Sequence, residues 1–159
     1  MEVFFALLII IVGYIIGLGA VTIIDLHGFL GRKSIYWTEA TIRTHKVTKP
    51  LIWIGILLVI VGGLWWYTLI GNEFFRLLHL FASGVLVING CFLSFVISPY
   101  LLKKEKEEKE RKLLPASLQA KIVLSFLFSV LFWWSSLILF IFSVSEFRGI
   151  SLPNPPFFG

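Results

Sequence analysis

The stretch "LIWIGILLVIVGGLWWYTLIGNEFFRLLHLFASGVLVINGCFLSFVISPYLL", Leu51–Leu102, is the most informative part of the sequence, because it joins two long apolar segments through a very short turn. The segments are Leu51–Ile70 and Phe74–Leu102. Each is long enough to cross about 30 Å of hydrocarbon, which takes roughly 20 residues of helix. The stretch therefore predicts two antiparallel helices that cross a membrane.

Two further apolar segments, Val3–Ile24 and Ile122–Val144, complete the set of predicted spans. The composition agrees, since 58% of the 159 residues are hydrophobic, which is too much apolar surface for one soluble core. We therefore expect an all-α integral membrane protein. Residues 1–159 are predicted to form a single transmembrane domain, built as a four-helix antiparallel bundle.

The charged residues predict the orientation of the bundle. Of the 14 Lys and Arg residues, five fall in the connection 25–50 and seven in the connection 103–121. By the positive-inside rule both connections lie in the cytosol, which leaves the N-terminus and the tail 145–159 outside. We expect this N-out, C-out arrangement in the cytoplasmic (inner) membrane, with the lipid bilayer as partner. The net charge of +5 follows from this topology, so no nucleic-acid partner is expected.

Both cytosolic connections contain predicted helical pieces. The run Lys103–Lys112, "KKEKEEKERK", pairs opposite charges at i,i+4 and predicts a charged cytosolic extension of helix three, either a solvated arm or a docking helix for a partner. Leu113–Pro115 is expected to end it, with Ser117 as the N-cap of helix four. In the first connection, Ile35–Val47 predicts a short interfacial helix, and Pro50 predicts the start of helix two.

Each predicted helix carries a stripe of small or polar residues, the kind of face through which helices associate in lipid. The stripes are Ala6, Gly13, Gly17 and Ala20 on helix one, Gly55 and Gly62 on helix two, Arg76, His79, Ser83, Gly90, Ser94 and Ser98 on helix three, and Ser125, Ser129, Ser136 and Ser143 on helix four. We expect helices three and four to hydrogen-bond across their contact. Close packing explains the stripes, although a serine-lined seam could also hold a cofactor or a water chain.

The tryptophans are expected at two depths. Trp65–Tyr67, at the outer end of helix two, fits the aromatic belt of a membrane interface. Trp133 and Trp134 fall near the middle of helix four. They either fill space beside a flat ligand or face lipid.

His79 is the best-placed candidate for chemistry, because ionisable residues within membrane helices usually face protein or water and often mark function. It lies about one and a half turns into helix three, with Arg76 one turn outward and Ser83 one turn inward. These three residues form the candidate cofactor-binding set. In the alternative interpretation, His79 ties helix ends together through a hydrogen bond to Glu2 or Glu146.

A second candidate set, Asp25, His27 and His45, falls in the first cytosolic connection. Two imidazoles and a carboxylate suit zinc, iron or copper, so a transition-metal site at the inner face is one interpretation. In the other, these residues anchor a basic loop at the interface, since no closely spaced HxxxH or ExxH motif is present. His45 and His79 are expected near opposite ends of the bundle, too far apart to ligate one iron.

The stretch Leu77–Leu101, "LLHLFASGVLVINGCFLSFVISPYL", resembles the histidine-bearing helix of small bacterial membrane proteins of the copper-resistance-D type and of the four-helix protoporphyrinogen-oxidase type. The shared pattern is an L-H start, a small residue in mid-helix and a basic exit after a late apolar turn. In those families the histidine is associated with haem or copper. The resemblance therefore implies a haem b or copper role for His79, and it covers one helix of this chain.

These observations support three interpretations of function. The first is a haem- or metal-binding, redox-associated bundle protein. The second is a non-catalytic membrane subunit or scaffold of a larger complex, acting with a membrane-protein partner or as a homo-oligomer. The third, a small proton-coupled transporter, is disfavoured because the predicted spans contain no central acidic residue. The sequence has no soluble-enzyme catalytic motif, and the single Cys91 excludes an internal disulfide or CxxC pair.

Overall fold

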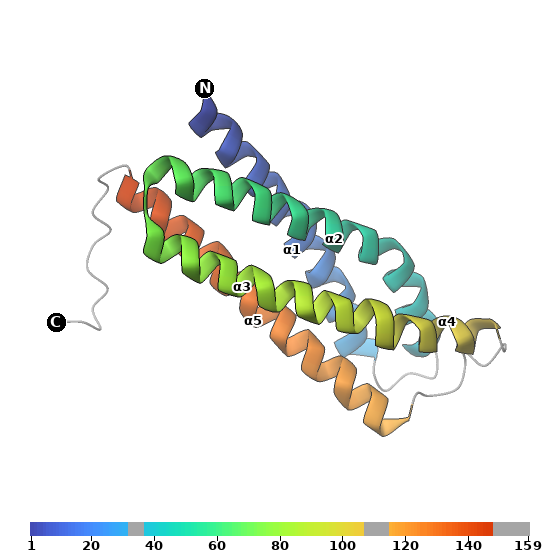
Figure 1. Ribbon diagram of the computed structural model, residues 1–159. Helices are drawn as coiled ribbons and strands as arrows, with labels where there is room; N and C mark the ends of the chain where they lie inside the picture. Colours follow the sequence, from blue (N-terminus) through green and yellow to red (C-terminus); the bar gives the residue numbers. More distant parts are fainter. Residues whose placement is uncertain (32–36, 107–114, 148–159) are drawn as a thin grey trace.

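The computed structural model describes residues 1–31, 37–106 and 115–147, which form helices and no strand. The elements are α1 (Glu2–Gly31), α2 (Trp37–Ile70), α3 (Glu73–Phe92), the π-helix η1 (Leu93–Ile97), α4 (Ser98–Lys106) and α5 (Ala116–Phe147). Helices η1 and α4 continue the line of α3, so the fold is an antiparallel bundle of four long rods (Figure 1). Around the bundle, α1 packs on α2, α2 on α3, α3 on α5, and α5 on α1. The predicted all-α four-helix architecture is confirmed.

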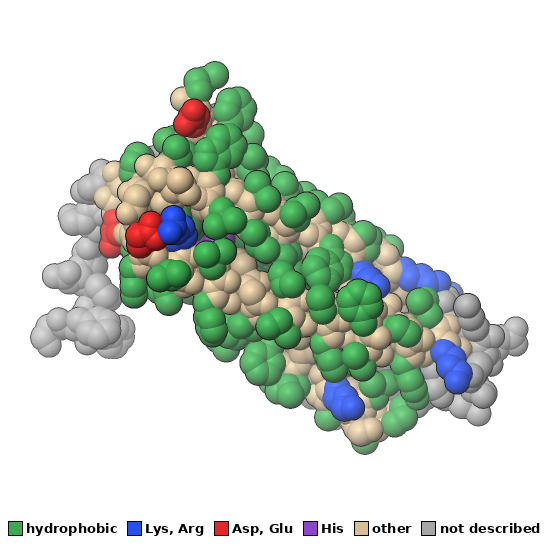
Figure 2. Space-filling model, viewed as in Figure 1, with side chains coloured by type: hydrophobic (Ala, Val, Ile, Leu, Met, Phe, Trp, Pro, Cys, Tyr) green, Lys and Arg blue, Asp and Glu red, His purple; other side chains and the backbone are tan. Residues whose placement is uncertain are grey.

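Within the described ranges, four helical stretches are long and apolar enough to cross a membrane, namely Glu2–Ile24, Ile42–Ile70, Glu73–Lys103 and Ala116–Phe147. Their outward faces carry large apolar side chains such as Ile15, Ile88 and Phe95, which are 68%, 71% and 76% exposed. Figure 2 shows this apolar surface along the bundle, with most of the visible Lys and Arg side chains near α4 and the visible acidic side chains at the opposite end. Such a surface is compatible with a multi-pass membrane protein.

Glycines allow α1 and α2 to approach each other closely, as their small-residue stripes predicted. A Cβ atom added at Gly13 would lie 2.8 Å from the backbone nitrogen of Val59, and one added at Gly55 would overlap the backbone of Gly17. Larger residues at these positions would push the two backbones apart. The glycines therefore fix the register of the antiparallel pair, and the stripes predicted for helices one and two are confirmed.

The first connection is more helical than expected. Helix α1 continues to Gly31, and α2 already begins at Trp37. The interfacial helix expected at Ile35–Val47 is therefore continuous with helix two over its described part. Residues 32–36, which include two of the expected cytosolic basic residues, lie outside the described ranges.

Pro50 lies inside α2, so the expected start of helix two at this proline is wrong. A proline within a helix removes one backbone hydrogen bond. The segment before it is held in place by packing, because Ile42 joins Ile97 and Leu101 in a second small core. Figure 1 shows α2 curving near its N-terminal end, and an internal proline is a common cause of such a bend.

A two-residue link joins α2 to α3, in agreement with the short turn predicted there. Gly71 has a φ of +67°, a left-handed conformation that glycine adopts most readily after a helix. Asn72 then caps α3, and its side chain accepts a hydrogen bond from the backbone N–H of Phe75 at 3.1 Å.

Between α3 and α4 the long rod contains one wider, π-helical segment, η1. The backbone N–H of Ser98 donates to the carbonyl of Leu93, five residues earlier, as in a π-helix. Pro99, which has no N–H to donate, follows directly. The charged extension predicted at Lys103–Lys112 is helical as far as Lys106, and the rest of it lies outside the described residues.

Helix four begins before its expected N-cap. Helix α5 starts at Ala116, and the backbone N–H groups of Leu118 and Gln119 donate to the carbonyl of Pro115. Ser117 therefore lies within the first turn, and its expected role as N-cap is wrong. Proline tolerates a position at a helix start because its own nitrogen needs no acceptor there.

Candidate functional site

His79 is fully buried in a cluster to which all four rods contribute. Its Nε2 lies 3.1 Å from the carbonyl oxygen of Val59 on α2, and its Nδ1 lies 3.3 Å from Ser136 Oγ on α5. Ser136 Oγ lies 2.8 Å from the hydroxyl of Tyr14 on α1. We call Tyr14, Val59, His79 and Ser136 the His79 cluster.

The hydrogen bonds of the His79 cluster have one consistent direction. A carbonyl oxygen only accepts, so Nε2 of His79 donates to Val59. A neutral ring then accepts at Nδ1 from the hydroxyl of Ser136, whose oxygen accepts from Tyr14. This assignment satisfies every side-chain polar group in the cluster. It also stabilises the bundle, because the chain of bonds connects all four rods.

The surroundings of His79 do not fit an axial ligand of haem. Both ring nitrogens face protein atoms, and a Cβ atom added at Gly63 would overlap Nε2. The ring of Tyr67 packs beside the imidazole, with 5.2 Å between ring centroids. The geometry instead matches a histidine that ties helices together, through partners on α2 and α5 rather than the expected acidic residues.

The residues predicted alongside His79 have other partners or none. Arg76 forms an ion pair with Glu73 on the same helix. Glu146, an expected partner of His79, accepts instead from the side chain that caps α3, at 3.3 Å. Ser83 is buried, and its Oγ has no hydrogen-bond partner among the described residues.

The inner candidate set is divided between two environments. His27 is exposed on α1, whereas His45 is buried on α2, and the side chain of Asp25 lies outside the described part of the structure. Among the described residues, no three His, Cys, Asp or Glu side chains are grouped as a metal site would require. The metal site at Asp25, His27 and His45 therefore stays a prediction.

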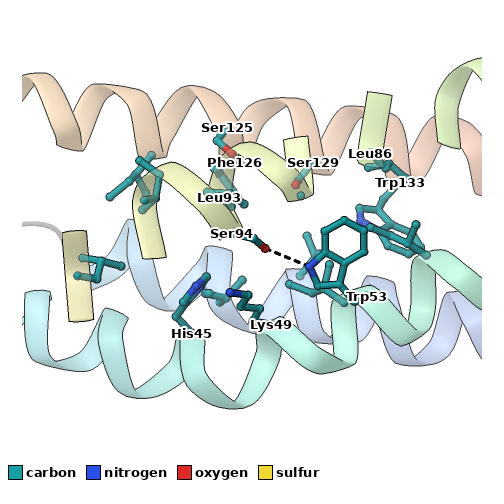
Figure 3. A pocket seen from close by; sticks show the side chains of 18 of the residues that line it. His45, Lys49, Trp53, Leu86, Leu93, Ser94, Ser125, Phe126, Ser129 and Trp133 are labelled. Carbon is teal, nitrogen blue, oxygen red and sulfur yellow. Dashed lines mark hydrogen bonds between the residues drawn. The ribbon is translucent and has the colours of Figure 1, made fainter. Parts of the chain in front are cut away.

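His45 lines a cavity that the sequence did not reveal (Figure 3). This deep cavity lies among α1, α2, the α3–η1–α4 line and α5, and its volume is about 90 Å³. Its walls are mostly apolar and include Ile52, Ile56, Leu86, Phe126 and Trp133. Its charged and imidazole lining, His45 and Lys49, lies on the side toward the basic end of the bundle, and three serine hydroxyls, at Ser94, Ser125 and Ser129, stand further along the walls.

A second cavity, of about 200 Å³, adjoins the deep cavity at this end. It shares His45, Lys49 and Leu101 with the deep cavity and adds Lys46 and Ser98. None of the described residues that line either cavity is acidic. We call the two cavities together the His45 pocket, and the second cavity its mouth. The pocket thus has a basic mouth and an apolar interior.

His45 brings an unsatisfied polar atom to this pocket. Its Nε2 is buried and has no hydrogen-bond partner among the described residues. Lys49 stands one helical turn further along α2, and Figure 3 shows both side chains reaching from α2 toward the pocket. Leaving a buried nitrogen unpaired costs free energy, so a polar group bound beside it would stabilise the protein.

Hydrogen bonds between helices hold the wall of the pocket together. Trp53 Nε1 on α2 donates to Ser94 Oγ on η1 at 3.1 Å. Asn89 on α3 donates to Ser129 Oγ at 2.9 Å and accepts from Ser125 Oγ at 2.7 Å. The hydrogen bonds expected between predicted helices three and four are confirmed. The sequence reasoning missed Asn89, although an amide in the middle of an apolar span is itself a signal for a helix contact.

The tryptophans occupy other positions than expected. Trp133 is buried against Gly17, whereas its neighbour Trp134 is 49% exposed. Trp66 was expected in an interface belt but is fully buried, and its Nε1 donates to Ser143 Oγ at 2.9 Å. Adjacent helical residues point about 100° apart, so one member of each Trp pair faces inward and the other faces outward.

No family model matches this chain, and the searches of curated proteins and of solved structures find no similar protein. The resemblance noted for Leu77–Leu101 stays a prediction.

Proposed function

We propose that this protein is a multi-pass membrane protein that holds a lipid-like molecule in the His45 pocket. The observation that carries this proposal is the division of the pocket into two parts. An apolar interior, with Ile56 and Trp133 in its wall, leads to a mouth that carries His45 and Lys49. A lipid-like molecule has the same division into an apolar chain and a polar head, so each part of the pocket would contact a matching part of the ligand.

The depth of the pocket suits one leaflet of a bilayer. Its lining on α2 extends from His45 to Ile56, eleven positions further along the chain. At 1.5 Å per residue this spans about 16 Å, roughly half of a hydrocarbon core about 30 Å thick. By the positive-inside rule, we assign the basic mouth to the cytosolic side of the cytoplasmic membrane and the ligand chain to the inner leaflet.

Binding of a lipid-like molecule agrees with this geometry better than the redox function suggested by His79. The two nitrogens of His79 are engaged with protein atoms, whereas His45 Nε2 is buried without a partner and the His45 side chain belongs to a cavity lining. A purely structural subunit would gain nothing from leaving such a nitrogen buried without a partner.

Lipid retained by the purified protein tests the proposal. We expect extraction followed by mass spectrometry to find a near-stoichiometric lipid in the wild-type protein purified in mild detergent. Ile52→Trp adds bulk to the cavity wall and should displace the lipid. Leu57→Trp is the control, because Leu57 is 62% exposed on the outer face of α2 and its replacement should leave the lipid in place. Equal lipid content in all three proteins would contradict the proposal.

An absorption spectrum of the same samples separates lipid binding from the redox alternative. We expect no Soret band, because the ring nitrogens of His79 already have partners. A stoichiometric Soret band that His79→Ala abolishes would favour the haem function instead.

A further inference from the structure

We infer that the ligand of the His45 pocket is a single-chain lipid with an anionic head, which Lys49 and His45 hold at the mouth while the chain fills the deep cavity. The inference rests on the proposed function and adds the charge, the chain number and the direction of the ligand.

The charge of the mouth favours an anion. Lys49 lines both cavities and has no ion pair among the described residues, and Lys46 lines the mouth as well. No described lining residue is acidic, so nothing in the described wall of the pocket neutralises Lys49. A cation beside an apolar wall is poorly solvated, and a bound carboxylate or phosphate would supply the missing counter-charge. A metal cation would instead be repelled by Lys49.

The unpaired nitrogen of His45 points to the same kind of ligand. The nitrogen is buried behind the His45 side chain surface that lines the pocket, and His45 lies one helical turn from Lys49. An imidazole N–H and an ammonium group both donate hydrogen bonds, and donors of this kind bind anionic oxygens most strongly. Ser98, which also lines the mouth, can donate a further bond from its hydroxyl. The mouth is therefore rich in donors and has the composition of a headgroup site.

The size of the deep cavity favours one chain over two. At roughly 10–15 Å³ of cavity per water-sized group, it holds on the order of six to nine such groups. A methylene group is about as large as a water molecule, so this volume holds a segment of one acyl chain and leaves no room for a second. The aromatic wall at Phe126 and Trp133 then contacts the chain along the inner part of the cavity.

Photoactivatable lipids of equal chain length test the inference on the full-length protein. The probes carry a diazirine in mid-chain and end in a carboxylate, a phosphate or a neutral alcohol. We expect the anionic probes to label peptides from α2 and α5 at the pocket, with half-saturating concentrations about tenfold or more below that of the alcohol. A preference for carboxylate or for phosphate would name the headgroup.

Variants at the mouth assign this preference to specific residues. Lys49→Gln should remove the tenfold preference for anionic probes, whereas Lys49→Arg should keep it. Lys121→Gln removes an exposed lysine of α5 that does not line the pocket, and should have no effect. His45→Gln should weaken labelling by the anionic probes several-fold, which gives a second test should Lys49→Gln fail to fold.

The outcomes separate the inference from the proposed function. If the alcohol labels the pocket as tightly as the anions, and Lys49→Gln changes nothing, the anionic headgroup is overturned while lipid binding stands. If no probe labels the lining peptides, lipid binding itself is wrong. Alcohol labelling that is unchanged in Lys49→Gln confirms that the pocket of the variant is intact.

Discussion

Two buried histidines at different levels of this bundle have opposite surroundings. His79 has protein partners at both ring nitrogens, and Gly63 lets α2 close over the ring. His45 is almost as deeply buried, yet its Nε2 has no described partner and it lines a pocket beside Lys49. Burial therefore does not distinguish a binding histidine from a structural one. The difference lies in whether the neighbouring residues satisfy the ring.

Packing gives the two surroundings their different character. Around His79, glycine on α2 and a hydroxyl on α5 bring neighbouring helices into direct hydrogen-bond distance of the ring. Around His45, bulky side chains such as Trp53, Phe126 and Trp133 line the space between the helices, and a cavity remains among them. A completed network stabilises the fold, whereas an incomplete one leaves binding capacity for a ligand.

The largest expected effect is the contrast between His79→Ala and His45→Leu. His79→Ala should lower the free energy of unfolding by about 3 kcal/mol, because it leaves a cavity and removes the acceptor of Ser136. His45→Leu should not lower it in protein stripped of bound lipid, since the replaced nitrogen has no described partner and its loss removes an unpaired buried polar atom. Titration with a denaturing detergent in mixed micelles measures both. Equal losses would remove the proposed distinction between the two histidines.

A slightly smaller effect is expected at Gly63. Gly63→Ala should lower the free energy of unfolding by about 2 kcal/mol, because the new methyl group would overlap His79 Nε2. Gly84→Ala is the matched control, since its Cβ would meet nothing within 4 Å and alanine favours a helix. Thermal denaturation in detergent compares the two variants. If both are equally stable, the space around His79 is looser than the structure indicates.

The bundle could be predicted from the sequence, whereas the pocket could not. Apolar length predicts the number of helices, and small residues such as Gly13 and Gly55 predict which faces meet, because both properties repeat along one helix. The pocket depends on distances between helices, to which His45, Ser94 and Phe126 contribute from separate parts of the chain. Helical periodicity shows the direction of a side chain, but not whether the opposite helix fills the space in front of it.

The same limit explains why the partners of His79 and the helical course of the first connection were not predicted. The helical face of His79 was predicted, but its partner Val59 offers a backbone carbonyl, which no side-chain pattern can reveal. The helical course through Pro50 depends on packing of Ile42 against α4 and η1, a tertiary contact that outweighs a local helix-breaking preference.

A third prediction concerns Asn89, which lies on α3 between the His79 cluster and the His45 pocket. Asn89→Leu removes its three hydrogen bonds to Ser125 and Ser129, and should lower the free energy of unfolding by about 1.8 kcal/mol, at roughly 0.6 kcal/mol for each bond between membrane helices. Ile88→Leu, on the exposed face of the same helix, is the control. Denaturation in mixed micelles measures the change. Equal stability of the two variants would mean that this polar contact adds nothing to the packing of α3 on α5.

The smallest effect is expected at the end of the His79 cluster, where Tyr14→Phe removes one hydroxyl. The ring still packs against Trp133 and Phe140, so the loss should be about 0.6 kcal/mol, the average for one hydrogen bond between membrane helices. Ser136→Ala should cost more, because it breaks the bonds on both sides of the serine.

A double-mutant cycle tests whether these bonds form one chain. Once Ser136→Ala has removed the acceptor of the tyrosine, adding Tyr14→Phe should cost almost nothing, since the hydroxyl has already lost its partner. Costs that simply add would show that Tyr14 and Ser136 are not coupled. In that case the hydrogen bonds of His79 would connect α2, α3 and α5 but not α1. The network around His79 would then be less complete than the structure indicates, and so less different from the surroundings of His45.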